Sequence, residues 1–325
     1  MKQAFHHKLL NGVFGDPCLQ IRIIRERRSL LFDLGDIHKL SPVSLNRVTD
    51  VFITHTHIDH FMGFDPLLRA SLRRIAPLTL YGPAGIIRNV EGRLRGYSWN
   101  LIEGYPLVIS VIEYDGRFLR RAVFRAESRF MKQTLPPTVS SGMLLEDPLF
   151  TVRAAVLDHG IPCLAFSLEE PFRINIDKDR LLKKNLSLGP WLTELRRKVR
   201  QGTSDGSLVI GGKRYPVRTL LDIVRTGRGQ KICFATDIGI SRTNADRLIA
   251  LASHADIFYC EAHFMEKNRD LATERFHLTT RECGRIARLA GVRNLYPMHF
   301  SPRYHGHEKD LIREVNEEFG NMVSC

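Results

Sequence analysis

The sequence predicts an α+β fold in which two sheets lie between outer helices, an αββα layering. Three observations lead to this prediction. Short apolar stretches with strand periodicity recur along the chain, amphipathic helical segments separate many of them, and 43% hydrophobic with 26% charged residues is the composition of an ordinary globular protein. Sheets and helices that each bury one face satisfy this order by stacking in layers. A single domain spanning residues 1–325 is expected.

The first half of the chain predicts paired strands followed by βα units. Residues 19–24 alternate apolar and polar side chains and form a predicted hairpin with 29–32. An apolar strand at 51–53 precedes a predicted helix from Phe64 to Ile75, whose arginines face outward. The remaining elements of this half are a strand at 78–83, a helix at 86–94 and antiparallel strands within 106–123.

The second half adds strands that end at polar residues. Strands are expected at 150–156, 163–168, 231–235, 257–260 and 294–298, and helices at 242–251 and 280–289. Residues 171–206 are rich in lysine and arginine and interrupt this pattern. We expect two short helices there, divided by Leu188-Gly189-Pro190, forming an insertion on the core.

The charge balance favours an anionic partner. Lysine and arginine number 48 against 35 acidic residues, which gives a net charge of +13 and a pI near 9.7. Such a surplus fits nucleic acid binding, although a solvated basic surface without a partner is the alternative. No apolar run is long enough to span a membrane. The first seven residues lack a secretory signal and the six cysteines form no CxxC pair, so a cytoplasmic location with reduced thiols is expected.

The segment Thr54-His55-Thr56-His57-Ile58-Asp59-His60 predicts a metal site. It places three imidazoles and one carboxylate directly after an apolar strand. These donors suit zinc and similar divalent ions, and the turn can direct them toward two adjacent points. Three buried histidines without metal would each need a separate polar partner, which makes a purely structural role the weaker interpretation.

Three further candidate ligands follow apolar strands elsewhere: His159, Asp237 and His299. A sheet would bring these strand ends to one edge. Together with the cluster they provide seven ligands, which is what two zinc ions sharing one bridging carboxylate require.

The chain resembles the metallo-β-lactamase superfamily, whose HxHxDH motif is matched by His55, His57, Asp59 and His60. The resemblance implies that His55, His57 and His159 hold one metal ion. It implies that Asp59, His60 and His299 hold the other and that Asp237 bridges the two. It also implies that Asp33 orients the ligand loop without binding metal itself. By residue type alone, Asp33 could equally be a turn or helix cap.

Within the superfamily the sequence is most similar to the ribonuclease Z family, over most of residues 30–305. Cys260-Glu261-Ala262-His263 resembles that family's His-Glu-Ala-Thr stretch, and His277-Leu278-Thr279 resembles the histidine-containing segment that accompanies it. Residues 78–83 resemble the strand that follows the family's metal motif. Residues 188–202 resemble its Gly-Pro and basic insertion. The chain departs from the family at Ile58, where glycine is usual, and at Cys260 and His263.

This resemblance implies an endoribonuclease that removes the 3′ trailer of precursor transfer RNA through a water activated by two divalent ions, expected to be Zn²⁺. Asp59 would accept the water's proton, and Glu261 would hold His277, which protonates the leaving oxygen. The 171–206 insertion becomes a candidate RNA-binding or dimer arm of a homodimer, with contacts expected from Gly189, Pro190, Arg196, Arg197, Lys198 and Arg200.

Two other functions are compatible with the same residues. A small-molecule or cyclic-nucleotide phosphodiesterase, or another hydrolase of this fold, would share all seven ligands. Such an enzyme would not need a basic arm, so the arm is the feature that distinguishes the two functions. A non-catalytic RNA-binding module with structural metals is the alternative of another class. Closed structural zinc sites usually use four protein ligands, often cysteine, and thiols are absent from this cluster.

Overall fold

The computed structural model describes residues 4–24, 26–320 and 323 of the chain. The chain forms two compact units. The first consists of Met1–Leu144, Val152–Leu168 and Lys231–Cys325, and the second of Leu145–Thr151 and Glu169–Gln230. The second unit is longer than the predicted 171–206 insertion because the strand Phe172–Ile176, at the start of that segment, pairs with Val224–Arg228, beyond its end.

The first unit contains an eight-stranded sheet in the order β1 to β8. Its hairpins β2–β3 and β6–β7 are antiparallel as predicted, whereas the neighbouring pairs β3–β4, β4–β5 and β5–β6 are parallel. The parallel pairs arise because helical crossovers join these strands. The strands are β1 (Phe5–Leu9), β2 (Leu19–Ile23), β3 (Ser29–Phe32), β4 (Val48–Phe52), β5 (Leu78–Pro83), β6 (Val108–Tyr114), β7 (Phe118–Arg125) and β8 (Lys132–Val139).

The second sheet has the order β18-β17-β16-β11-β10-β9. Strands β16, β17 and β18 run parallel, so their carboxyl ends lie at one edge. The strands are β9 (Met143–Glu146), β10 (Thr151–Asp158), β11 (Pro162–Glu169), β16 (Lys231–Ala235), β17 (Ile257–Glu261) and β18 (Leu295–Met298).

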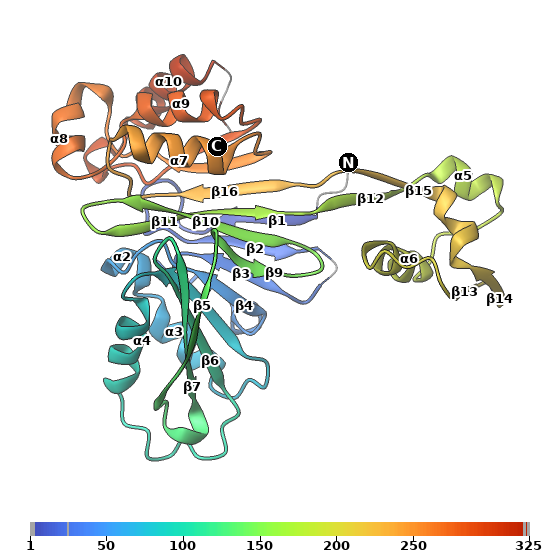
Figure 1. Cartoon of the computed structure of the whole chain (residues 1–325). Helices are drawn as coiled ribbons and strands as arrows, with labels where there is room; N and C mark the ends of the chain where they lie inside the picture. The colour runs from blue at the N-terminus through green and yellow to red at the C-terminus, as the bar shows by residue number, and fades with distance from the viewer. Residues whose placement is uncertain (1–3, 25, 321–322, 324–325) are drawn as a thin grey trace. The chain divides into compact units, whose positions relative to one another are not determined.

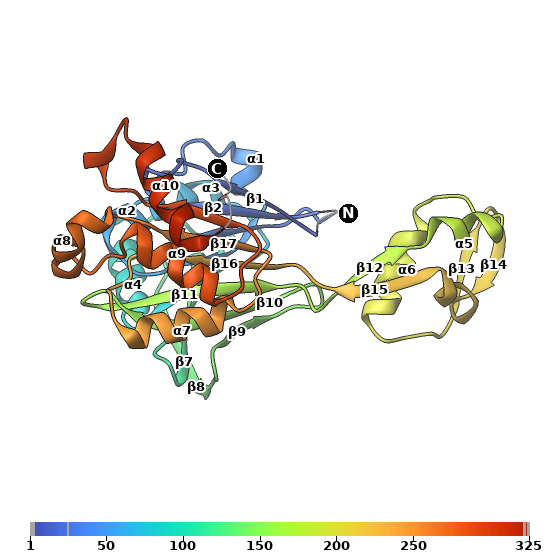
Figure 2. The ribbon, with the colours of Figure 1, turned by 90° about the horizontal axis from the view of Figure 1, so that it is seen from above.

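Helices cover the outer faces of the two sheets in the first unit, as Figures 1 and 2 show. One apolar core joins α3 and α4 to the first sheet, and another joins α7, α9 and α10 to the second. Between the sheets, the Phe32 ring stacks on Phe52 at 4.9 Å and lies 5.7 Å from Phe166 of the facing sheet. The αββα prediction is therefore confirmed. The helices of this unit are α1 (Pro42–Leu45), α2 (Ile58–Phe61), α3 (Phe64–Ser71), α4 (Ile86–Arg95), α7 (Arg242–Ala252), α8 (Arg269–Glu274), α9 (Thr280–Leu289) and α10 (Glu308–Phe319), with short 3₁₀ turns at Ala126–Ser128, Glu266–Asn268 and Pro302–Tyr304.

The second unit has its own small core and is not purely helical (Figure 2). The two predicted helices are present on either side of Gly189-Pro190, but two antiparallel strand pairs, β12–β15 and β13–β14, accompany them. Its elements are β12 (Phe172–Ile176), α5 (Lys178–Lys183), α6 (Trp191–Arg200), β13 (Ser207–Ile210), β14 (Lys213–Pro216), a 3₁₀ helix at Val217–Ile223 and β15 (Val224–Arg228).

One predicted helix is too long, and some predictions reach beyond the described residues. Helix α3 ends at Ser71, because the Arg74 guanidinium binds the carbonyls of Ala76 and Pro77 and closes a turn, which leaves Ile75 exposed. The five described cysteines are free and buried, whereas Cys325 and residues 1–3 of the N-terminal segment lie outside the described residues. Within the described ranges, no helix has the length and apolar character needed to cross a bilayer.

Candidate metal centre

The predicted ligands meet because strands of both sheets end at one edge of the first unit. Asp33 follows β3 and the Thr54–His60 loop follows β4, which are parallel neighbours. His159, Asp237 and His299 follow β10, β16 and β18 of the second sheet. A hydrogen bond from Leu164 N to Thr54 O (2.9 Å) ties the second sheet to the ligand loop. Residues far apart in the sequence thereby share one site.

Three of these residues have an unusual backbone conformation. Asp33, Asp237 and His299 have φ angles of +60°, +57° and +57°. This left-handed region is uncommon for residues with a side chain, although aspartate, asparagine and histidine enter it more readily than others. It turns each chain sharply at a strand end. Strained backbone of this kind clusters at functional sites, where the surrounding structure maintains it.

His55, His57 and His159 form a first group of potential ligands. The His55 ring lies 4.4 Å from that of His57 and 5.2 Å from that of His159, measured between centroids. One nitrogen from each ring lies within 4.8 Å of the other two. His55 and His159 are buried and His57 is exposed. Three imidazoles arranged in this way can hold one divalent ion and leave a position for water.

Asp59, His60 and His299 form a second group. His60 Nε2 lies 3.3 Å from Asp59 Oδ2, and His299 Nε2 lies 3.9 Å from the same oxygen. The His60 side chain is fully buried, whereas that of Asp59 is 39% exposed. The exposed carboxylate therefore faces the solvent side of this group.

Asp237 lies between the two groups. Its Oδ1 is 3.5 Å from His159 Nε2, and its Oδ2 is 3.1 Å from His60 Nε2. One carboxylate oxygen thus faces each group, which is the arrangement that a bridging ligand requires.

The Nδ1 atoms of two candidate ligands, His60 and His159, have the partners typical of metal-binding histidines. His60 Nδ1 donates a hydrogen bond to Asp33 Oδ2 at 2.9 Å, and His159 Nδ1 donates one to Phe276 O at 2.7 Å. Such bonds direct the Nε2 lone pair toward a metal. Among the described residues, the buried Nε2 atoms of His55 and His60 make no well-aligned hydrogen bond, even though carboxylate oxygens lie near that of His60. The residues therefore fit a pair of divalent ions.

The electrostatics of the site agree with this arrangement. Burial, with a smaller effect from His60, lowers the pKa of His55 to about 2, so its imidazole is neutral and available as a ligand. Burial opposes a charge on His299, but Asp237 and Asp59 outweigh it and raise its pKa to about 10. A metal ion must displace the proton of such a histidine, so binding is expected to weaken as the pH falls.

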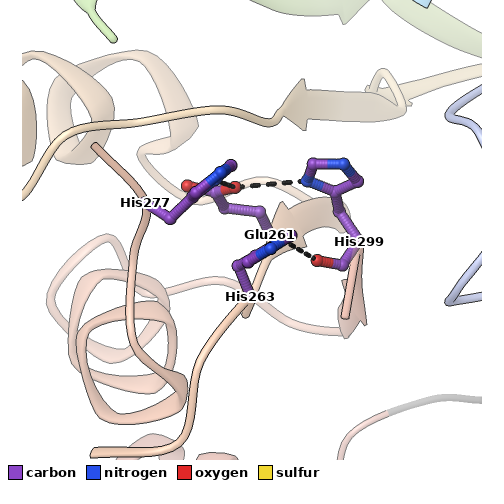
Figure 3. A group of neighbouring side chains, drawn as sticks. All are labelled: Glu261, His263, His277 and His299. Atoms are coloured by element: carbon purple, nitrogen blue, oxygen red, sulfur yellow. Dashed lines mark hydrogen bonds and ion pairs between the residues drawn. The ribbon is translucent and has the colours of Figure 1, made fainter. Parts of the chain in front are cut away.

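Glu261 and His277 lie beside this centre (Figure 3). His277 donates from Nδ1 to Glu261 Oε2 (3.0 Å), and Glu261 Oε1 accepts from the backbone N–H groups of Ile238 and Leu278 at 2.8 and 2.9 Å. The carboxylate therefore connects the loop after Asp237 with the segment carrying His277. Burial raises the pKa of Glu261, but His277 and His299 outweigh that effect and hold it well below its usual range, so the group is ionised.

A cavity of about 460 Å³ opens onto both features. His57, Asp59 and His277 line it, as do Arg275 and Arg303, which the sequence interpretation did not select. Their signals in sequence were weak, because a single arginine in a basic chain does not stand out. His263 also lines the cavity, and its position two residues after Glu261 was the clue, since alternate residues of an extended chain share a side.

The predicted RNA-binding residues lie in the second unit, and several have internal partners. Arg200 binds Glu170 at 2.9 Å, with both side chains largely buried, and Arg197 binds Glu194 on the same helix. Trp191 is buried and donates to Ser187 O, so it packs in this unit's core. A Cβ on Gly189 would lie 3.1 Å from the Trp191 ring, which gives the Gly-Pro turn a packing role. Lys198 and Arg196 donate to backbone carbonyls of the unit.

Comparison with known sequences finds close relatives, although no family model matches the chain. It is 31% identical over 297 residues to a ribonuclease Z of Deinococcus radiodurans, covering 89% of this chain and 88% of the relative. It is 29% identical over 312 residues to a ribonuclease Z of Brevibacillus brevis, covering 92% and 85%. A ribonuclease BN of Proteus mirabilis is 29% identical over 307 residues, covering 91% and 87%.

Solved structures support the same fold. The metallo-β-lactamase fold protein YhfI from Bacillus subtilis matches with a TM-score of 0.56 at 16% identity, covering 97% of this chain and 93% of that one. The short form of human tRNase Z matches with a TM-score of 0.54 at 21% identity, covering 90% and 92%. At these identities the likeness establishes the metallo-β-lactamase fold, in agreement with the prediction from the HxHxDH motif.

Proposed function

Because this chain belongs to the ribonuclease Z family, we propose that it is a metal-dependent endoribonuclease that removes the 3′ trailer of precursor transfer RNA. The observation that carries the proposal is the convergence of seven imidazole and carboxylate side chains, five of which line one open cavity together with His277 of the Glu261–His277 pair. A nuclease needs both parts, because one activates water and the other protonates the leaving oxygen.

The proposed ligand sets follow the two groups of side chains. His55, His57 and His159 would hold one ion, and Asp59, His60 and His299 the other. Asp237 would bridge them, supported by the position of one oxygen on each side. Donor sets rich in imidazole nitrogen suit Zn²⁺, which is the ion we propose for both positions.

The chain's own residues supply the proton transfers. When bound, a metal pair would lower the pKa of the attacking water and offset charge on the phosphate. Asp59, ionised and partly exposed, would accept the proton of that water as its oxygen attacks phosphorus. The P–O3′ bond breaks, and His277, held through Nδ1 by Glu261, would donate the proton to the leaving 3′ oxygen. Asp33 would keep His60 in the tautomer that binds metal.

Asp237 provides the test of this proposal. Purified protein with measured metal content is incubated with a precursor transfer RNA and, separately, with a generic phosphodiester, and the cut position is mapped. Cleavage just after the acceptor stem is expected. Asp237→Asn keeps the left-handed backbone accessible and should lose both metal and turnover. Asp246→Asn, at a 68% exposed side chain, is the control. RNA processing that survives in D237N would refute the metal-dependent mechanism.

The second unit is proposed as an RNA-binding arm. Arg197 and Lys198 are its best candidates for phosphate contacts, because the Arg200–Glu170 pair is largely buried. The Arg197–Glu194 pair is exposed to solvent, and Lys198 donates to a backbone carbonyl. Replacing both by glutamine should raise KM for precursor RNA and spare cleavage of a small phosphodiester. The control removes the same charge from the first unit, at the exposed Arg242 and Lys309. Equal loss on both substrates would contradict an arm role.

A homodimer in the cytoplasm completes the proposal. The free, buried state of the five described cysteines is compatible with a reducing compartment. Light scattering of the purified protein tests the assembly, since a mass equal to that of one chain at micromolar concentration would refute the dimer.

A further inference from the structure

We propose that His263 is a positioning residue that holds the His277 ring in the orientation required for proton transfer. The inference rests on the role proposed above for His277, and it concerns a residue at which this chain departs from its family, where threonine occupies the corresponding position. His263 follows β17 and lines the cavity beside the metal centre.

The two imidazole rings are stacked face to face. Their centroids lie 3.9 Å apart and their planes differ by 8°. Figure 3 shows the His263 ring beside His277, with its bond toward the His299 backbone. His263 Nδ1 lies 2.8 Å from His299 O, which can only accept, so the Nδ1–H donates and restrains the His263 ring together with its neighbour Phe264. Phe264 contacts the His263 ring edge-on at 4.6 Å.

This stack supplies a restraint that the Glu261 hydrogen bond does not. The bond at Nδ1 sets the distance of His277 from Glu261, and the neighbouring rings of His159 and His299 lie at 59° and 54° to the His277 plane, so these contacts do not present a flat surface against which the ring is held. A flat ring held against one face limits the tilt of the His277 ring and directs Nε2 toward the cavity. A threonine side chain has no flat surface with which to do so. Stacked aromatic pairs commonly contribute enough to change a rate by about 3- to 10-fold.

The backbone around His263 does not depend on its side chain. Ser301 N donates to His263 O at 3.0 Å and Ala262 N donates to Met298 O at 2.9 Å. Substitution should therefore leave the fold and the metal ligands in place. His263→Ala removes both the stack and the bond to His299 O, whereas His263→Phe restores a flat ring without the hydrogen bond.

The kinetic test compares two leaving groups. An RNA 3′ oxygen leaves poorly and needs a proton, whereas the p-nitrophenolate of bis(p-nitrophenyl) phosphate leaves without one. H263A should lower kcat on RNA by about 3- to 10-fold with KM unchanged, should cost less on the nitrophenyl substrate, and should be largely restored in H263F. In a His277→Ala background, the H263A substitution should cost less than in the wild type. Equal losses on both substrates, or in both backgrounds, would overturn the inference.

A crystal structure of metal-loaded H263A tests the inference without turnover. Loss of a single orientation of the His277 ring is expected, with Glu261 and the ligands unmoved; a ring that keeps its orientation would overturn the positioning role. This readout separates the two proposals. Wild-type protein that leaves precursor RNA uncut would refute the proposed function. The orientation of the His277 ring in the H263A structure would still show whether His263 positions it.

Discussion

Substitution of Asp33 by asparagine should weaken metal binding at the position formed by His60. Asp33 is completely buried. Its Oδ1 accepts from Thr54 N at 2.7 Å, and its Oδ2 accepts from Thr54 Oγ1 and His60 Nδ1, each at 2.9 Å. Asparagine has the same shape and tolerates the φ of +60°. The substitution therefore tests hydrogen-bond chemistry with little change in packing.

The expected magnitude follows from the tautomer of His60. In Asp33→Asn, the new amide oxygen would take the bond from Thr54 N, which leaves the NH₂ group facing His60 Nδ1. The imidazole must then carry its proton on Nε2, where it cannot bind metal, or place two donors against each other. Leaving a buried donor unpaired costs about 1–3 kcal/mol. That cost corresponds to a metal affinity lowered by roughly 10- to 100-fold, as is typical when the partner of a ligating histidine is lost.

The assay is competition for Zn²⁺ with a chromophoric chelator, read as two binding constants, with thermal denaturation as a check on folding. Asp36→Asn removes the charge of a nearby exposed carboxylate that bonds to His38, two residues away, and serves as the control. One weakened and one nearly unchanged site is expected for D33N. Wild-type affinity at both sites would refute the assignment of the His60 tautomer.

Three other predictions concern stability. A Cβ on Gly63 would lie 2.5 Å from Gly35 O, so Gly63→Ala should lower the free energy of unfolding by about 1–3 kcal/mol in a denaturant titration, whereas Gly92→Ala, with open space around its Cβ, should not lower it. Bonds from backbone N–H groups, such as that of Phe118 at 2.7 Å, lower the pKa of Asp115 to about 2. Because the folded pKa lies below the unfolded value of about 3.9, the stability lost in Asp115→Asn should be largest above pH 5 and shrink toward pH 2; a pH-independent difference would contradict this. Removing metal by chelation should lower the melting temperature, and Zn²⁺ at 100 times its dissociation constant should restore about 2.7 kcal/mol, whereas an unchanged melting temperature would argue against metal binding to the folded chain.

Particular elements explain why the sequence predicted much of the fold. Strand β17 and helix α9 were predicted almost to the residue, because β17 begins with four consecutive apolar residues and α9 has a clear helical period with a capping threonine at 279. Strand β8 was missed, since all of its residues are exposed and it contains two prolines. Proline is tolerated on an edge strand, where one N–H needs no partner, so no local pattern marked it.

For the metal centre too, some features could be predicted from neighbouring residues in the sequence, whereas others depend on contacts between distant segments. The residue types and their places after apolar strands were evident from the sequence, because donors and strand periodicity are local properties. The bridging position of Asp237 between the two ligand groups was implied only by the family resemblance. The pairing of strands far apart in sequence places one of its oxygens beside each group. The pairing of Arg200 with Glu170 and the burial of Trp191 likewise depend on contacts that no periodicity contains.

The sequence by itself determined the identity of the donors, the order of most strands and helices, and membership of the ribonuclease Z family. Only the tertiary structure decided that His263 lies flat against His277, and that the second unit extends to Gln230. The physical reason is that donor chemistry and periodicity belong to neighbouring residues, whereas contacts between rings and between strands depend on how distant segments pack.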